Sequence, residues 1–344
     1  MKRLRYIDTL KFIGIYIIYL AHLGPGVGHI YEIAFTCAVQ LFFFLSGCME
    51  AKTGRKEGLK EYVCKKIKYL LVPWLFFAIL SIIFLVIDLN MTARSAVELL
   101  LPVARGCVRN EFFAGALWFL PCLFVMSVIF RVLTFWNNKI WIILSGWIMC
   151  LSAELLTGQD PSIHPVWLWN FDSALYYIIF FSTGYVFYPW MNQLFTQRNK
   201  RNSIILLISF VISGVIFAMV FFGHDPLKML YSLPRGTTWG AILLSMVLVW
   251  FLVIVAWFFQ NVWILAEIGK CSLYLCGNEW IIKTLFSKGL AIIGWEECLD
   301  SPLSACIYTL FLMWLVYKYV VPIEKQFLDK ITNRNRIKKF TEVG

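Results

Sequence analysis

Long apolar segments separated by short polar breaks run along the chain from Tyr6 to Pro322. A membrane-spanning helix needs ~20 consecutive apolar residues, so this pattern predicts about ten spans in an all-α, polytopic membrane helix bundle. A shorter apolar segment at 97–104 is expected to form a partial or interfacial helix. The predicted spans cover residues 6–27, 33–50, 67–88, 112–134, 139–157, 172–191, 203–223, 239–260, 271–293 and 303–323.

Three polar residues, Asp8, Lys11 and His22, interrupt the first span. At ~100° per residue, the eleven-residue separation of Lys11 and His22 brings them to within about 20° of one helix face, roughly 16 Å apart, and Asp8 falls on the same face. Ionisable groups at this depth are costly, which favours a functional interpretation. The structural alternatives are a neutral histidine hydrogen-bonded inside the bundle and an i,i+3 ion pair between Asp8 and Lys11.

Composition and charge support a membrane protein and set its orientation. Apolar residues make up 60% of the 344 residues and charged residues only 15%. If the N-terminus is cytoplasmic, 23 of the 31 Lys and Arg residues fall on the inner side and six on the outer side, so both termini are expected to be cytoplasmic. The net charge of +11 is then a topology signal, which excludes nucleic-acid binding as an expected function. We expect one transmembrane domain at 1–324 and a basic cytoplasmic tail at 325–344.

Processing signals, cysteines and soluble-enzyme motifs add little. The first apolar segment is too long for the core of a cleaved signal peptide, ~7–15 residues, so it is expected to remain as the first span. None of the ten cysteines has metal-ligand spacing or belongs to a disulfide framework, and no metal is predicted. The motifs of zinc hydrolases, serine hydrolases, P-loop proteins and dinucleotide-binding proteins are not found in the sequence.

Two loops depart from a plain polar connection. The inner loop at 51–74 carries seven basic residues ahead of Pro73 and Trp74. It is read either as positive-inside bias with anionic-lipid contact or as a platform for a phosphorylated ligand. The outer loop from Glu154 to Asp172 mixes carboxylates with Trp167 and Trp169. This mixture is compatible with a sugar, although tryptophan anchoring at the interface is the more common explanation.

Two further spans contain residues that favour close packing or an interruption of the helix. In the second span, Ser46 and Gly47 are small enough to let another helix or a ligand approach the backbone. In the fourth span, Pro121 interrupts the hydrogen-bond ladder about one turn after Trp118, which predicts a kink.

The ninth span places Gly277, Asn278, Glu279 and Lys283 near its middle. Glu279 and Lys283 stand in the favourable i,i+4 order, so a buried ion pair is favoured over a catalytic role. From the residues alone, a histidine buried in a membrane bundle can act as a general base, and transporters use the same parts, so catalysis and proton-coupled transport both stay open.

The ordered motifs RYIDTLKFIGIYIIYLAH, LFFFLSG, KKIKYLLVPW and LWFLPCLF resemble the integral membrane acyltransferase 3 family over essentially the whole chain. This family includes O-acetyltransferases that modify cell-surface polysaccharides. The resemblance implies transfer of an acyl group, usually acetyl, from cytoplasmic acetyl-CoA to a hydroxyl of a glycan or a related acceptor. It also implies a multi-pass protein of the cell membrane whose partners are lipid, acyl-CoA and the acceptor.

The resemblance assigns roles to individual residues. His22 matches the essential first-span histidine, as base or as transient acyl carrier, with Asp8 orienting the site. Lys11 stands where arginine is more usual, and Tyr69 where another arginine is expected; Glu279 falls near a position that is often histidine. The implied contacts to acyl-CoA are Lys11, Lys65, Lys66 and Lys68, and the groups considered near the acceptor or the oxyanion are Ser46, Trp118, Asn278 and Glu279.

Two other classes remain beside the acyltransferase. A transporter or flippase of a glycolipid or a small anion would use Asp8, Lys11 and His22 as a proton or ion path. An inverted repeat would favour this class, and none is evident in the sequence. A membrane scaffold or sensor with degenerate chemistry is the third class, which the altered position at Glu279 keeps open.

Overall fold

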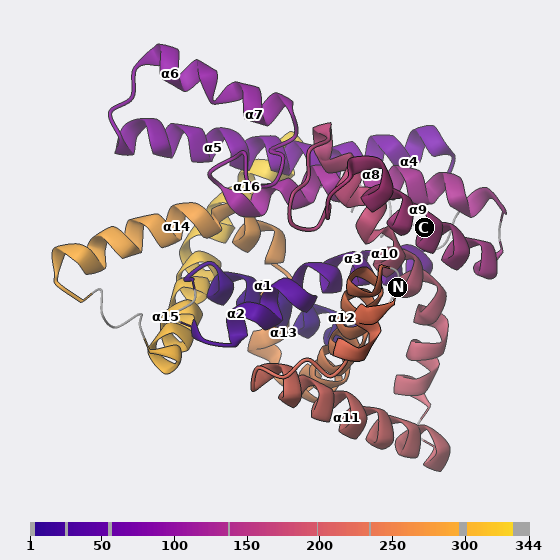
Figure 1. The fold of residues 1–344 in the computed structure, drawn as a ribbon. Helices are drawn as coiled ribbons and strands as arrows, with labels where there is room; N and C mark the ends of the chain where they lie inside the picture. The colour runs from indigo at the N-terminus through magenta and orange to yellow at the C-terminus, as the bar shows by residue number, and fades with distance from the viewer. Residues whose placement is uncertain are drawn as a thin grey trace, which may run out of the picture. The chain divides into compact units, whose positions relative to one another are not determined.

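The computed structural model describes residues 4–24, 27–53, 57–136, 138–197, 199–233, 235–295 and 301–332. All regular secondary structure in these residues is helical (Figure 1), which confirms the predicted all-α class. The described residues fall into two compact units. Unit 1 comprises those of Met1–Thr53, Phe180–Ser272 and Gly289–Trp314, and unit 2 those of Gly54–Ile179, Leu273–Lys288 and Leu315–Gly344.

Within the described part of the chain, seven helices are long and apolar enough to cross a membrane, and each falls on a predicted span. The other three predicted spans are also helical, as α1 (Arg5–Ala21), α10 (Phe171–Thr196) and α14 (Ser272–Ile292). The short segment expected at 97–104 forms α6 (Ala93–Glu98) and α7 (Leu100–Ala104). The seven are Ile30–Thr53, Leu59–Asp88, Gly115–Leu133, Lys139–Thr157, Lys200–Phe221, Gly236–Asn261 and Pro302–Ile331.

Unit 1 is organised around α1, which packs against α2, α3, α12 and α13 (Figure 1). Twelve of the 17 residues of α1 are buried. Besides α1 and the later part of α10, unit 1 contains α2 (Ile30–Ile33), the π-helix η2 (Ala34–Ala38), α3 (Val39–Thr53), α11 (Lys200–Phe221), η7 (Lys228–Ser232), α12 (Gly236–Phe258), η8 (Phe259–Asn261), α13 (Trp263–Gly269) and α15 (Pro302–Leu315).

The first span is shorter than predicted, because α1 ends at Ala21 rather than near residue 27. The chain turns after His22, and Gly24 and Gly28 adopt φ values of 94° and 68°. Such left-handed conformations end a helix and are easily reached only by glycine. His22 therefore lies at the end of α1 as its C-cap.

A reciprocal pair of glycines brings α3 and α10 into backbone contact within unit 1. A Cβ atom added to Gly47 would lie 2.0 Å from the carbonyl oxygen of Phe181, and one added to Gly184 would lie 2.0 Å from that of Phe44. The close helix approach predicted at Ser46 and Gly47 is therefore confirmed.

In unit 2, nine of the 15 residues of α8 are buried. Ring contacts join α5 to α14 through Phe77 and Tyr274 (centroids 6.2 Å apart) and to α16 through Phe76 and Phe327 (5.4 Å). The other elements of unit 2 are α4 (Leu59–Lys66), the π-helix η3 (Ile67–Leu71), α5 (Val72–Asp88), α6, α7, η4 (Gly115–Trp118), α8 (Phe119–Leu133), η5 (Thr134–Trp136), α9 (Lys139–Thr157), η6 (Leu168–Asn170), the start of α10, most of α14, the π-helix η10 (Val316–Val320) and α16 (Val321–Ile331).

Three boundaries refine the sequence-based expectations. Pro121 is the third residue of α8, in the first turn, where proline costs the helix little because early backbone N–H groups lack intrahelical partners. The short 3-10 helix η4 directly precedes α8. Helix α16 continues past the expected tail boundary at 324 to Ile331, and residues 333–344 of the expected basic tail lie outside the described residues.

Candidate functional site

The polar face of α1 is the first candidate site. The backbone of α1 is α-helical from Arg5 to Ala21, and His22 remains right-handed (φ −75°, ψ −4°), its N–H donating to the Ile18 carbonyl at 3.1 Å. The helical spacing between Lys11 and His22 therefore holds, and the two side chains share a face with Asp8. Asp8 is 3% exposed, whereas Lys11 and His22 are half-buried.

Close backbone packing fixes the position of this helix within unit 1. A Cβ atom added to Gly269 at the end of α13 would lie 1.9 Å from the carbonyl oxygen of Asp8. Farther along α1, Gly14 packs against Phe42, and the Tyr16 hydroxyl donates to the Cys306 carbonyl at 3.3 Å. The helix that carries the polar face is thus held by neighbours near its beginning, middle and end.

The basic segment of α4 and η3 is the second candidate, in unit 2. The ammonium of Lys65 pairs with Glu57 and lies 3.8 Å from Glu61, so part of its charge is neutralised. Lys66 lies 5.0 Å from the ring centroid of the buried Tyr62, and Lys68 is exposed. The exposed Lys68 is therefore better suited than Lys65 to binding phosphate.

Arg131, at the end of α8, completes this basic cluster and was not singled out from the sequence. Its side chain is 8% exposed, donates to the Glu57 carbonyl and lies 5.2 Å from the Tyr62 ring centroid. Tyr62 therefore contacts two cations, Lys66 and Arg131. The sequence offered no signal for this, because Arg131 is an isolated basic residue at the end of a span.

Asn278 and Glu279 lie in a buried polar cluster in unit 2. The Asn278 amide donates to Glu324 on α16 at 2.7 Å, and the side chains of both residues are buried. Glu279, 2% exposed, lies 3.5 Å from the Lys283 ammonium, which confirms the ion pair predicted for this span. Glu324 was missed because it follows the last predicted span and its partner is 46 residues away.

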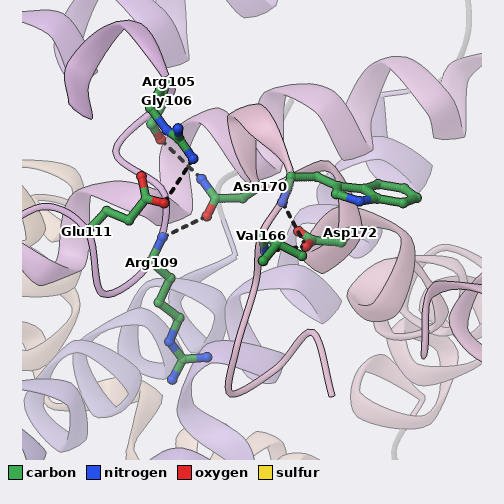
Figure 2. Close-up of polar contacts among 8 residues, drawn as sticks. Arg105, Gly106, Arg109, Glu111, Val166, Asn170 and Asp172 are labelled. Atoms are coloured by element: carbon green, nitrogen blue, oxygen red, sulfur yellow. Dashed lines mark hydrogen bonds and ion pairs between the residues drawn. The ribbon is translucent and has the colours of Figure 1, made fainter. Parts of the chain in front are cut away.

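Trp118 contacts a third group of polar residues in unit 2, of which Arg109 and Asn170 are labelled in Figure 2. Its carbonyl accepts from the Asn170 amide at 3.5 Å, and the Arg109 guanidinium lies 5.1 Å from the Trp118 ring centroid. The Asn170 amide also donates to the Gly106 carbonyl (3.1 Å), and its oxygen accepts from the Arg109 N–H (3.0 Å) (Figure 2). Arg109 and Asn170 were not singled out from the sequence, since isolated polar residues in loops follow no periodic pattern.

The carboxylates of the outer loop hold the loop itself. Asp172 is fully buried and accepts from the N–H group of Val166 at 2.7 Å (Figure 2). It also accepts from the N–H groups of Trp167 (3.0 Å) and Ser173 (2.8 Å). Asp160 likewise accepts from the Ser162 N–H at 2.8 Å. These bonds give the two carboxylates structural roles in shaping the loop.

The structure places the sequence-predicted residues in two groups. Asp8, Lys11, His22 and Ser46 belong to unit 1, where the Ser46 hydroxyl donates to the Phe42 carbonyl of its own helix at 2.8 Å. In the described residues, no group of three or more His, Cys, Asp or Glu side chains is arranged to hold a metal ion. The predicted residues in unit 2 are Lys65, Lys66, Lys68, Trp118, Asn278 and Glu279.

A helical bundle with several candidate spans and ionisable side chains within its apolar helices defines a multi-pass membrane protein built to do more than span the bilayer. The family model of the acyltransferase domain, Acyl_transf_3, matches residues 4–319. The chain therefore belongs to this family and is a membrane acyltransferase. No curated protein and no solved structure matches it.

Proposed function

We propose that this protein is an O-acetyltransferase of the cell membrane that moves an acetyl group from cytoplasmic acetyl-CoA to a hydroxyl of a cell-surface glycan or a related acceptor. The observation that carries the proposal is the unbroken α1 helix, which keeps Asp8, Lys11 and His22 on one face in a member of an acyltransferase family. An imidazole can exchange a proton near neutral pH, which is what activation of an alcohol requires.

In the proposed reaction, His22 acts as general base. It removes the proton of the acceptor hydroxyl while the hydroxyl oxygen attacks the thioester carbonyl carbon. The resulting tetrahedral intermediate collapses with cleavage of the carbon–sulfur bond, and the imidazolium returns the proton to the leaving sulfur, which departs as the CoA thiol. The products are the acetyl ester and CoA, and His22 is again neutral.

The other residues are proposed to bind and orient. Two groups of lysines, each considered within its own unit, are proposed to suit a phosphate of acetyl-CoA, because ammonium groups act as compact point charges. They are Lys11 in unit 1, and Lys66 and Lys68 in unit 2. Asp8 is proposed to orient Lys11 on the shared helix face.

The test is acetyl transfer by membranes that contain His22→Ala, with labelled acetyl-CoA as donor and the surface glycan fraction as acceptor. Loss of a positioned base lowers the rate by about 10²–10⁴-fold. The matched control is His29→Ala, since His29 is exposed and pairs with Glu32 at the surface; this variant should keep the wild-type rate. Transfer at the wild-type rate by His22→Ala would remove His22 from the mechanism. Label that never leaves CoA in the wild type would refute the proposed reaction.

A further inference from the structure

Arg109 stands out among the basic residues of unit 2 because of where its side chain points. Its backbone N–H is fixed by Asn170, while the guanidinium extends away from the neighbouring Arg105–Glu111 ion pair (Figure 2). The side chain is half-buried. The guanidinium of Arg109 is thus partly shielded from water, and it does not join the ion pair between Arg105 and Glu111.

The partners of the Arg109 guanidinium are all neutral in the described residues. It donates to the Ser162 carbonyl, lies 5.1 Å from the centroid of the Trp118 ring and interacts electrostatically with Tyr177. No carboxylate of the described chain lies within 4.0 Å of it, whereas Arg105 in the same loop lies 3.0 Å from Glu111. A guanidinium carries five N–H donors, so these contacts leave donors for another acceptor.

The nearby acidic residues do not fill this role. Asp160 and Asp172 direct carboxylate oxygens toward backbone N–H groups of the outer loop. The hydrogen bond and the ring contact compensate the guanidinium only with neutral groups. An anion forms a stronger, charge-assisted bond with a guanidinium, so the arrangement favours an anionic group supplied by a ligand.

The backbone around Arg109 is held in uncommon conformations. Cys107 and Trp169 adopt φ values of 47° and 59°, in the left-handed region that residues of these types rarely occupy. Asn110 and Asn170 adopt φ values of 71° and 54° in the same region, which asparagine tolerates more easily. The Trp169 N–H donates to the Arg105 carbonyl at 2.8 Å, which ties the two strained segments together. Strain of this kind gathers at ligand sites and is maintained there by the surrounding contacts.

We infer that Arg109, with Trp118 and Tyr177 beside it, forms an anion subsite that recognises a carboxylate or phosphate group on the acyl acceptor. This inference rests on the proposed function in that it names the acceptor as acidic. Trp118 limits the rotation of the guanidinium through cation–π contact, and Tyr177 contributes a neutral polar group, so an oxyanion can be held by a guanidinium of fixed orientation.

The experiment compares three probes that differ in one substituent: methyl glucoside, methyl glucuronide and methyl glucoside 6-phosphate. Binding to the purified full-length protein in nanodiscs is measured by equilibrium titration, and acetyl transfer from labelled acetyl-CoA is measured in parallel. The wild type is expected to bind one anionic probe at least about tenfold more tightly than the glucoside, since a charge-assisted bidentate contact is worth a tenfold factor or more. The tighter of the two anionic probes identifies the group as carboxylate or phosphate.

The variants separate a ligand contact from a structural role. Arg109→Gln should abolish the preference for the anionic probe, and Arg109→Lys should retain part of it, because lysine keeps the charge but lacks the fork. Arg105→Gln is the matched control in the same loop and should keep the full preference, since Glu111 already neutralises Arg105. Unfolding temperatures establish that each variant is folded, and Arg109→Lys carries the test should Arg109→Gln fail to fold.

Two results would overturn the inference: equal binding of all three probes by the wild type, or an anionic preference that survives in Arg109→Gln. Arg109-dependent binding without acetyl transfer to any probe would support the subsite while counting against the proposed function. The binding and transfer measurements thus distinguish the failure of one from the failure of the other.

Discussion

The contact between α1 and α13 allows a sharp test of how strictly the position of α1 is set. Replacing Gly269 by alanine would place a Cβ atom 1.9 Å from the Asp8 carbonyl oxygen and 2.9 Å from the Phe12 nitrogen. Ordinary contact begins at 3.4 Å, so the approach is about 1.5 Å too close. Both nearest groups are backbone atoms, so no side-chain rotation can relieve the clash and one helix must move.

The expected consequence of Gly269→Ala is a loss of both stability and activity. Overpacking of a close contact costs about 1–3 kcal/mol. A displacement of α1 by about 1 Å would carry Asp8 and its neighbours Lys11 and His22 with it, and a misplacement of that size can lower a catalytic rate by about 10²-fold. Thermal unfolding of the purified protein measures the first effect, and acetyl transfer from labelled acetyl-CoA measures the second.

Gly289→Ala is the matched control, because Gly289 lies inside helix α14 and an added Cβ atom would meet nothing within 4 Å. This variant should be neutral or stabilised by up to about 1 kcal/mol, since alanine favours a helix over glycine. If Gly269→Ala unfolded at the same temperature as Gly289→Ala and transferred acetyl groups at the same rate, the reasoning about α1 would be refuted.

Three further outcomes are expected from polar and thiol groups in unit 2. Asn278→Ala should lower the free energy of unfolding by about 1–3 kcal/mol because it leaves the buried Glu324 carboxylate without its amide donor; an unchanged unfolding transition would show that the pair is not structural. Asp172→Ala should lower the free energy of unfolding by about 3 kcal/mol, because three backbone N–H groups lose their common acceptor. Asp172→Asn should lower the free energy of unfolding by less, because the amide oxygen can still accept some of these hydrogen bonds. Burial raises the pKa of the Cys107 thiol to about 12, so at pH 8 iodoacetamide should alkylate Cys107 more than tenfold more slowly than the exposed Cys64. The rate of Cys107 alkylation should rise with pH up to about pH 12. Equal alkylation rates for the two cysteines at pH 8, measured by mass spectrometry, would contradict the burial of Cys107.

The apolar pattern predicted the fold class and the helix positions well because membrane spans are set by length and composition. In the part of the chain that the structure describes, each of the seven helices that are long and apolar enough to span a membrane coincides with a predicted span. The end of α1 was placed some six residues too late, since hydropathy alone does not report that Gly24 takes a left-handed conformation. The i,i+4 pair of Glu279 and Lys283 was predictable because both partners lie on one helix, whereas the bond from Asn278 to Glu324 joins helices distant in sequence.

The outer loop shows the same limit for the candidate site. Its composition suggested carboxylates open to a sugar, yet the Asp172 carboxylate is satisfied by three backbone N–H groups. Arg109, which no pattern marked, lies outside this loop in sequence, contacts it through Ser162 and Asn170, and has no carboxylate within 4.0 Å in the described chain. Which polar side chains remain available to a ligand depends on turns and strained residues, and these arise from three-dimensional packing rather than from periodicity.

Two prolines show when a helix face can be read directly from residue spacing. Pro73 and Pro322 each follow a five-residue π-helix, Ile67–Leu71 and Val316–Val320, and in both cases the π-helix begins six residues before the proline. A proline lacks the N–H and its ring clashes with the carbonyl four residues earlier, and a wider turn moves that carbonyl away. The added residue turns the following face by about 100° relative to an uninterrupted α-helix. Residue spacing alone therefore does not give the helix face shared by Lys65 and residues after Pro73. Helix α1 contains no such turn, so the shared face of Lys11 and His22 follows from their spacing.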